Sequence, residues 1–433
     1  MKVCFLSIEH EIIRKDDIKH DIFIRFPEYT RRSILWSCPN LSLLTIAGFF
    51  PSDWSMEYID LNMDEIPNTN YDYIIMSLTT AQALKGYKVA DYFREQGVKV
   101  ILGGIHVSSC PDEALIHADA ICIGEVEGIV HELIADMKDR KMREVYRGKK
   151  EPPLDNAKLP RYDLAKKYHY RTIAIQVTRG CPHQCEYCSS STLYGYRRRQ
   201  MEIITIEKIL LSILDVWPNP FLFFTDDNLF IDDAFTNKLL QLLERYKIQW
   251  YAFSDVSIAK KKEIIKQMRR SGCKQLLIGF ESLSNTTLSQ INKSGWKNMM
   301  LDYYEPAIAA VQAEGIGIVG SFMFGLDGES KDVFDSMAQF IINNNIYATN
   351  LTIMTPFPGT RIYERLKREN RIFENRWDRY NGFELTYFPE WGSPENFMEE
   401  FINLNITVNT DGRINKVIRH FIDVYKTSIT YDY

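Results

Sequence analysis

The first 145 residues alternate short apolar runs with segments in which apolar residues recur at helical spacing. The apolar runs predict strands at Val3–Ile8, Met56–Ile59, Tyr73–Leu78, Val98–Leu102 and Ala120–Ile123. The periodic segments predict helices at Leu41–Phe49, Ala83–Gln96 and Gly128–Lys138. Continuous apolar strands that alternate with helices are typical of a parallel sheet covered on both faces. We therefore expect an α/β fold that begins with a Rossmann-like domain over residues 1–145.

A charged, proline-bearing segment from Lys141 to Lys167 shows little periodicity and predicts a linker, placed at residues 146–170. A second alternating series follows. Its strands are expected at Thr172–Val177, Phe221–Phe224, Trp250–Phe253, Gln275–Phe280, Ile316–Met323 and Ala348–Met354. Its helices are expected at Ile206–Val216, Asp233–Tyr246, Lys261–Ser271, Tyr304–Glu314 and Ser330–Asn343. Six such units predict a partial (β/α)6 barrel over residues 171–370, followed by a small, mostly helical C-terminal region over residues 371–433.

Composition narrows the class of protein. Apolar residues make up 45% and charged residues 25% of the chain, which is usual for a globular protein. The net charge of −5 argues against a dedicated nucleic-acid binder. No apolar stretch reaches the roughly 20 residues of a membrane span. The apolar start, Val3–Ile8, is soon followed by charged residues and is too short for a signal peptide. We expect a cytoplasmic protein.

Three of the eight cysteines form a tight group, Cys181, Cys185 and Cys188, directly after a predicted strand. The other five are scattered and are expected to be buried or free thiols. Three thiolates on one loop can hold one face of a cubane iron–sulfur cluster and leave one iron open to a small molecule. The alternatives are a zinc site with His183 as the fourth ligand, which has poor spacing, and a disulfide, which leaves one cysteine over.

This loop resembles the signature of radical S-adenosylmethionine (SAM) enzymes. The matching stretch reads Thr178-Arg-Gly-Cys181-Pro-His-Gln-Cys185-Glu-Tyr-Cys188. Later strand ends continue the resemblance with Thr225-Asp-Asp-Asn-Leu-Phe230, Ile278-Gly-Phe-Glu-Ser282, Phe324-Gly-Leu-Asp-Gly-Glu329 and Thr355-Pro-Phe-Pro-Gly-Thr360. The resemblance implies a 4Fe–4S cluster on the three cysteines, reductive cleavage of SAM to a 5′-deoxyadenosyl radical, and an external reductant such as flavodoxin or ferredoxin.

The same resemblance implies residues that contact SAM. They are Tyr187, Phe224, Thr225, Ser254, Glu281, Met323 and Pro356. Two of them have plainer alternatives, because Met323 could be barrel packing and Glu281 could form a salt bridge within the barrel. The basic triplet Arg197–Arg199 is either a solvated face or the source of one arginine that turns inward to bind the carboxylate of SAM or an anionic substrate.

The glycine-rich strand ends of the first domain resemble the cobalamin-binding domain that precedes the barrel in one large radical SAM class. Gly-Gly-x-His and Gly-Glu-x-Glu both occur here, and a serine replaces the usual glycine after Pro39. The implied cobalamin contacts are Leu41, Ser42, Leu43, Ser77, Thr79, Gly103, Gly104, His106, Gly124, Glu125 and Glu127. Because the Asp-x-His-x-x-Gly signature is missing, we expect no histidine ligand on cobalt. Residues Trp36 to Leu41 are expected to shield its lower face, and Cys38 is a less favoured ligand.

The resemblance implies an enzyme that activates an unreactive C–H bond of a small-molecule or natural-product substrate and then methylates it from methylcobalamin. The alternative is a radical rearrangement, cyclisation or coupling, with or without bound cobalamin. A non-catalytic sensor would need an output module, and neither a helix-turn-helix nor a basic tail is evident. The catalytic residues and the substrate cannot be identified from the sequence. The aromatic segment Trp377–Trp391 either caps the barrel mouth or packs against the C-terminal region.

Overall fold

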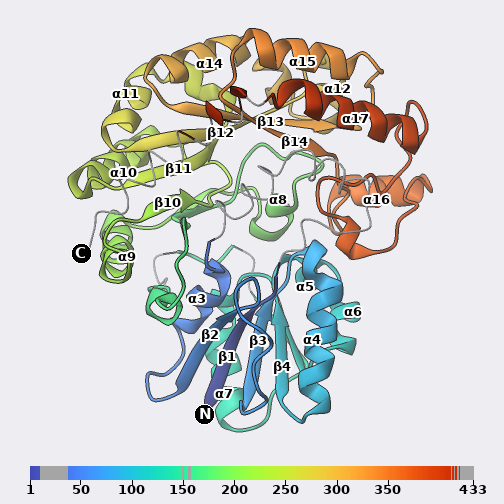
Figure 1. The fold of residues 1–433 in the computed structure, drawn as a ribbon. Helices are drawn as coiled ribbons and strands as arrows, with labels where there is room; N and C mark the ends of the chain where they lie inside the picture. The colour runs from blue at the N-terminus through green and yellow to red at the C-terminus, as the bar shows by residue number, and fades with distance from the viewer. Residues whose placement is uncertain are drawn as a thin grey trace.

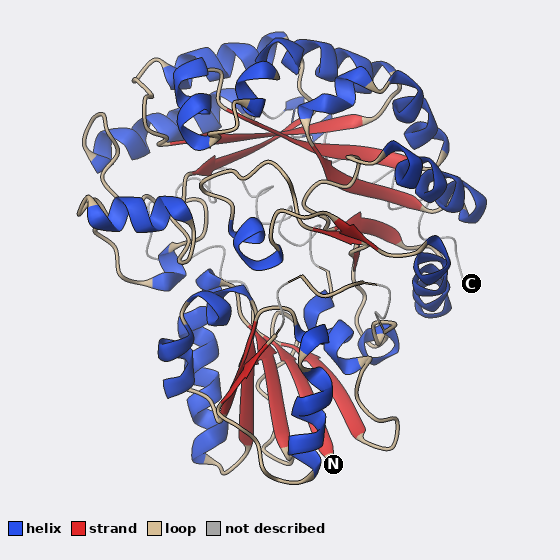
Figure 2. Ribbon diagram, turned by 180° about the vertical axis from the view of Figure 1, so that it is seen from behind, coloured by secondary structure: helices blue, strands red, loops and turns tan. Residues whose placement is uncertain are grey.

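A computed structural model describes residues 1–9, 38–148, 151–154 and 158–410, with residues 412–413, 415–416 and 419 beyond them. Two α/β units lie one above the other (Figure 1). The lower unit contains the first parallel sheet, and the upper unit contains a wide, curved second sheet with helices on its outer side (Figure 2). Of the expected cobalt shield, Trp36 lies outside the described residues.

The first sheet has six parallel strands in the order β2-β1-β3-β4-β5-β6. The strands are β1 (Lys2–Ser7), β2 (Ser55–Asp60), β3 (Tyr73–Ser77), β4 (Lys99–Gly103), β5 (Ala120–Ile123) and β6 (Val145–Arg147). The helices are α3 (Leu41–Ala47), α4 (Ala83–Glu95), α5 (Ile105–Ser109), α6 (Pro111–Ile116) and α7 (Val130–Lys138), with short turns η1 (Thr80–Gln82) and η2 (Val126–Gly128).

The second sheet also has six parallel strands and stays open between its edges, in the order β14-β13-β12-β11-β10-β7. The strands are β7 (Ile173–Ile175), β10 (Phe221–Phe224), β11 (Gln249–Ser254), β12 (Cys273–Glu281), β13 (Gly317–Phe324) and β14 (Ala348–Ile353). The helices that alternate with them are α9 (Ile203–Val216), α10 (Asp233–Tyr246), α11 (Lys262–Arg270), α12 (Asn285–Ile291), α13 (Trp296–Met299), α14 (Tyr304–Ala313) and α15 (Val333–Asn343). The expected α/β class and partial barrel are confirmed.

Smaller elements complete the described chain. They are η3 (Tyr162–Ala165), η4 (Val256–Lys260), η5 (Leu301–Tyr303), η6 (Trp377–Arg379), the antiparallel pair β8 (Thr178–Arg179) and β9 (Arg199–Gln200), and the helices α8 (Ser189–Tyr194), α16 (Arg361–Arg368) and α17 (Pro394–Val408). Most of the expected C-terminal helix beyond residue 410 lies outside the described residues.

Alternating side chains of β1 show how the core is divided. Cys4 and Leu6 join a buried cluster on one face of the first sheet. Val3 and Phe5 join a larger cluster on the other face, which continues without a break into the second unit. Tyr162, from the segment expected to be a linker, is part of that larger cluster. The two units therefore share one hydrophobic core, and removing this surface from water stabilises their contact.

The strand β6 and the β8–β9 pair are among the elements that were not expected from the sequence. The strand β6 lies inside the segment predicted as a linker and adds a sixth strand to the first sheet. Only the middle one of its three residues, Tyr146, is buried, so its pattern is too short to be recognised. The β8–β9 pair is two residues long on each side and brackets the cysteine loop and α8.

The carboxyl ends of the two sheets face each other. The helix α5, just after β4, contacts α8, which follows the cysteine loop. The views from front and back agree that the strand ends of the lower sheet point toward the upper unit (Figures 1 and 2). Ligands of open parallel sheets bind beyond these strand ends, so the arrangement brings both predicted cofactor edges together.

No helix in the part of the chain that the structure describes is both long and apolar enough to cross a bilayer.

The adjacent glycines at the end of β4 give a matched test of this edge. Gly104 has φ +99°, and a Cβ there would lie 2.6 Å from the Leu78 backbone nitrogen. Gly104→Ala should lower the free energy of unfolding by about 2–4 kcal/mol, from left-handed strain together with overpacking. Gly103→Ala should be neutral or slightly stabilising, because its Cβ would make ordinary contacts at 3.7 Å. Equal effects of the two variants in denaturant titrations would contradict this account.

Candidate functional site

The three cysteines of the predicted cluster site lie on one loop between β8 and α8. Each is a free thiol and is half-buried. Burial raises the pKa of Cys181 to about 12, and the nearby Cys185 and Cys188 thiols raise it further in the same direction. Burial also raises the pKa of Cys188. Because metals bind thiolates, assembly of a cluster here must release protons, and the donor set suits a soft metal centre.

Polar side chains from the loops after successive strands hold this cysteine loop. After β10, Asp226 is completely buried and accepts hydrogen bonds from the backbone and hydroxyl of Thr178, the hydroxyl at 2.6 Å. After β11, Asp255 Oδ2 lies 2.9 Å from His183 Nε2. These contacts fix the loop across the carboxyl edge of the second sheet.

His183, the fourth ligand in the zinc alternative, is engaged elsewhere. Its imidazole stacks on Trp296 with ring centroids 3.8 Å apart and pairs with Asp255. Burial would raise the pKa of Asp255, but the hydrogen bond from His183 and its other donors outweigh burial and hold the pKa at about 2. The carboxylate is therefore charged and keeps the imidazole turned toward β11. Among the described residues, no three His, Cys, Asp or Glu side chains surround the position of a single metal ion.

Glu281, a predicted SAM contact, lies in a buried ion pair. Its carboxylate is 3.0 Å from Lys297 Nζ, and both side chains are at most 10% exposed. Burial and the negative charge of Glu281 raise the pKa of Tyr187, which hydrogen-bonds to the same carboxylate. Glu281 has φ +65° beside an irregularity in the β12–β13 register. The salt-bridge alternative for Glu281 is thus observed, and its contact with SAM stays a prediction.

The other predicted SAM contacts occupy the carboxyl ends of neighbouring strands. Phe224 is completely buried and packs edge-on against Trp250. Thr225 is half-buried and its hydroxyl donates to the Ile175 carbonyl at 3.3 Å. Ser254 lies at the end of β11, Met323 is half-buried in β13, and Pro356 is buried after β14. The structure brings them to one edge, and their contacts with SAM stay predictions.

Some of the predicted cobalamin contacts lie in α3 and in the turn after β3. Leu43 is buried in the core, whereas Ser42 is exposed and Leu41 half-buried at the start of α3. The backbone and hydroxyl of Thr79 donate to Gln82 Oε1 in a local cap.

The glycines at this edge differ in the space around them. Gly104 is required by the close approach of Leu78, so its lack of a side chain has a structural cause. Gly103 has ordinary contacts, and Ser77 is half-buried beside it. At Gly124, with φ +85°, no atom lies within 4 Å of an added Cβ. Gly124 therefore offers backbone with open space in front of it, as close approach to a ligand needs.

His106 is completely buried in α5, which follows β4. Its ring packs against Trp377 at 5.3 Å, and its Nε2 lies 3.7 Å from Glu113. Burial lowers the pKa of His106, which outweighs the opposing influence of Glu113. The ring is thus buried against Trp377, and its contact with cobalamin stays a prediction.

The two predicted cobalamin contacts Glu125 and Glu127 form a buried cluster of ion pairs with the second unit. Glu125 lies 2.7 Å from Arg179 and 2.8 Å from Arg199, and Glu127 lies 2.6 Å from Arg179. No side chain of the four is more than 10% exposed. Burial would raise the pKa of Glu127, but Arg179 outweighs it and holds the pKa below its usual value.

This charge cluster gives one arginine of the basic triplet a partner that neither alternative included. Arg199 turns inward and binds Glu125, with further hydrogen bonds to the carbonyls of Pro152 and Tyr194. Arg179 stands two residues before Cys181, so the cysteine loop begins at a side chain fixed to the first sheet. Whether Glu125 and Glu127 also contact cobalamin stays a prediction.

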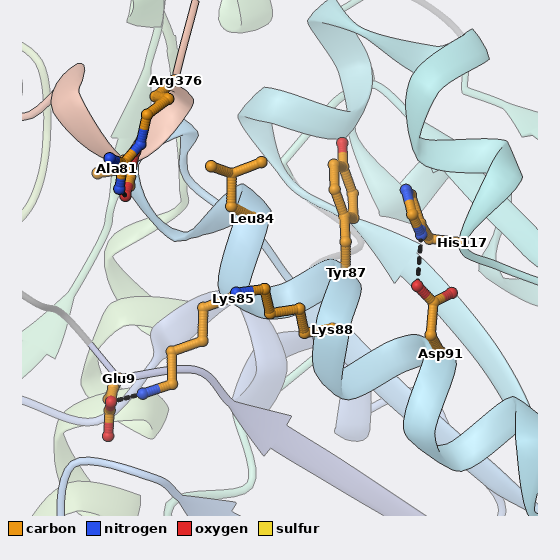
Figure 3. A pocket seen from close by; sticks show the side chains of 10 residues that line it. Glu9, Ala81, Leu84, Lys85, Tyr87, Lys88, Asp91, His117 and Arg376 are labelled. Atoms are coloured by element: carbon orange, nitrogen blue, oxygen red, sulfur yellow. Dashed lines mark hydrogen bonds and ion pairs between the residues drawn. The ribbon is translucent and has the colours of Figure 1, made fainter.

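A pocket of about 520 Å³ opens on the outer side of α4 and η6 (Figure 3). Lys85, Tyr87, His117 and Arg376 are among the described residues that line it, and no predicted cofactor contact is among them. His117 is paired there with Asp91 at 2.8 Å.

Sequence reasoning missed the polar residues that support the cysteine loop, above all Asp226, Asp255 and Lys297. Asp226 lies in the acidic turn Thr225–Phe230 after the second strand of the barrel, but its hydrogen-bond partners precede it in the sequence by 48 and 49 positions. A charged residue directly after a buried strand was the available signal for Asp226 and Asp255. Lys297 carried no such signal.

Comparison with known proteins gives two family matches. The model of the radical SAM superfamily matches residues 175–341, and that of the B12 binding domain matches residues 31–134. A bacteriochlorophyllide d C-12(1)-methyltransferase of Chlorobaculum tepidum is 29% identical, over 87% of this chain and 84% of that protein. A hopanoid C-2 methylase of Rhodopseudomonas palustris is 27% identical, over 77% of this chain and 65% of that protein.

Among solved structures, the radical SAM methyltransferase TsrM of Kitasatospora setae, with cobalamin and a [4Fe-4S] cluster bound, superposes with a TM-score of 0.69. The alignment is 12% identical and covers 95% of this chain and 89% of that one. At this identity the likeness shows the shared fold.

The buried charge cluster can be tested by removing one partner. Glu125→Ala should lower the free energy of unfolding by about 3–5 kcal/mol, because the buried Arg199 loses its counter-charge and Arg179 loses one of its two. The control is Glu132→Ala, which removes an ion pair with Arg143 at 2.6 Å whose side chains are more than half exposed. That variant should lose far less stability, because exposed ion pairs contribute little. Similar losses for both variants in chemical denaturation would contradict the importance of the buried cluster.

Proposed function

Since this chain belongs to the cobalamin-binding class of radical SAM enzymes, we propose that it methylates an unactivated carbon atom of a small-molecule substrate. The sequence-based expectations of an enzyme, a 4Fe–4S cluster, SAM and cobalamin are confirmed by the two family matches and by relatives named as methyltransferases. The observation that carries the proposal is the facing of the two strand-end edges, with Arg179 bound to Glu125 and Glu127 between them.

The residues divide the work between the two edges. Cys181, Cys185 and Cys188 would hold the cluster, and the open backbone at Gly124 would lie against cobalamin. When bound, the cluster and SAM supply a hydrogen-abstracting radical, and cobalamin carries the methyl group. The chain itself holds the two edges in register, because a substrate carbon must come within a few ångströms of each reacting group.

The relatives bear on the class of substrate. Two of them are named as a bacteriochlorophyllide methyltransferase and a hopanoid methylase. We extend this to an apolar, polycyclic substrate for the present chain. An external one-electron reductant, such as flavodoxin or ferredoxin, would supply electrons to the cluster. We place the protein in the cytoplasm.

A labelling experiment tests the proposed reaction. Anaerobically reconstituted protein receives cobalamin, a reductant, SAM with a deuterated methyl group, and a chlorophyll-type macrocycle or a polycyclic lipid. The expected result is a substrate that gains one labelled methyl group, together with 5′-deoxyadenosine. Formation of 5′-deoxyadenosine with a rearranged, unmethylated product would instead support the cyclisation or coupling alternative.

Removal of the cluster ligands should stop the chemistry at its first step. The triple variant in which Cys181, Cys185 and Cys188 are alanine should lose iron–sulfur absorbance and all SAM cleavage, because no thiolate remains to bind iron. It should still retain cobalamin after gel filtration. Cys110→Ala is the matched control, since Cys110 is also a half-buried free thiol but lies on the first domain. A 4Fe–4S cluster in the triple variant would overturn the assignment of the ligands.

A further inference from the structure

Asn292 is a fully buried amide at the end of α12, pressed against the cysteine loop. The preceding residue, Ile291, accepts a hydrogen bond from the backbone nitrogen of Glu186 at 2.9 Å. The Asn292 side-chain nitrogen donates to the His183 carbonyl and lies 3.7 Å from the Cys185 sulfur. One side chain from the loop after β12 therefore reaches both the backbone and a cysteine of the predicted cluster site.

The orientation of this amide follows from its partners. The Asn292 side-chain oxygen accepts hydrogen bonds from the Ser294 hydroxyl at 2.7 Å and from the Trp296 backbone nitrogen at 3.1 Å. A backbone nitrogen can only donate, so the oxygen must face Trp296. The His183 carbonyl can only accept, so the amide nitrogen must face the loop. The chemistry of both ends thus gives the same orientation, with an N–H group directed at Cys185.

The other hydrogen bonds to the cysteine sulfurs come from the loop itself or from α8, the helix that follows it. Cys181 is hydrogen-bonded by the backbone of His183, and Cys188 by Ser191. Lys297 is the charged group near Cys185, but its ammonium is paired with Glu281 at 3.0 Å. Asn292 differs from these groups because it joins the barrel to a cysteine sulfur through a neutral, oriented donor.

We propose that Asn292 is a positioning residue that donates a hydrogen bond to the Cys185 thiolate and raises the reduction potential of the cluster. Reduction adds one electron, taken from an external one-electron donor, and no bond is formed or broken. The reduced cluster carries more negative charge on its sulfur ligands, so a donor stabilises it more than the oxidised cluster. Hydrogen bonds to the sulfurs are a general determinant of such potentials. The inference rests on cluster binding by the three cysteines and not on methyl transfer.

The test is a redox titration of the reconstituted full-length protein without SAM or substrate, followed by the EPR signal of the reduced cluster. Asn292→Ala should lower the midpoint potential. At the wild-type midpoint, we expect the ratio of reduced to oxidised cluster to fall about tenfold, which corresponds to about 59 mV for one electron. Ser294→Ala, which removes one of the two anchors of the amide oxygen, should shift the potential in the same direction by less.

Asn298→Ala is the matched control, because Asn298 lies close by and donates to the Asn285 carbonyl and Ser289 hydroxyl. Its potential should equal that of the wild type. The proposal is overturned if Asn292→Ala binds a full cluster at an unchanged potential, or if Asn298→Ala shifts the potential equally. If Asn292→Ala binds no cluster, Ser294→Ala decides: a lowered potential supports the proposal and an unchanged one overturns it. Because no SAM is present, these results do not depend on which reaction the enzyme catalyses.

Discussion

Charges that leave water must find counter-charges, and at the junction of the two sheets this requirement determines the arrangement of the whole molecule. Glu125 and Glu127 follow strand β5 of the first sheet, and Arg179 and Arg199 bracket the cysteine loop of the second unit. Neither pair could stay buried without the other, because an unpaired buried charge costs several kcal/mol. The distance between the two cofactor edges is therefore set by short ion pairs.

The cysteine loop is held in place by residues along the carboxyl edge of the second sheet. Its partners come from the loops after β10, β11 and β12, among them Asp226, Asp255 and Asn292. Parallel strands bring their carboxyl ends to one line, so residues far apart in sequence can hold the same short loop. Each of these partners is polar and nearly buried, which favours one geometry over alternatives, since unmatched polar groups are costly. The site thus depends on the register of the sheet as much as on the cysteines.

The sequence predicts regular structure and the cluster loop well because both leave local signals. Apolar periodicity identifies long strands such as β12, and Cys181–Cys188 lie within eight positions. The contacts that hold the cysteine loop leave no local signal in the sequence, since Arg179 is separated from its partner Glu125 by 54 positions. The Gly-Glu-x-Glu motif gave no sign that both side chains bind arginines in the folded chain, and its predicted contact with cobalamin stays a prediction. Short elements such as β8 and β9 have too few residues for a periodic pattern.

The contact of Trp377 with the first domain has a consequence for motion. Its indole nitrogen donates to Glu113 at 2.9 Å, from a turn that follows the whole barrel in sequence. On another side, the Tyr170 hydroxyl donates to Asp60 at 2.6 Å. The two units are thus fastened at separate points around the central charge cluster. Hinge opening would have to break these contacts together, so we expect the two units to keep their mutual orientation and to move as one rigid body.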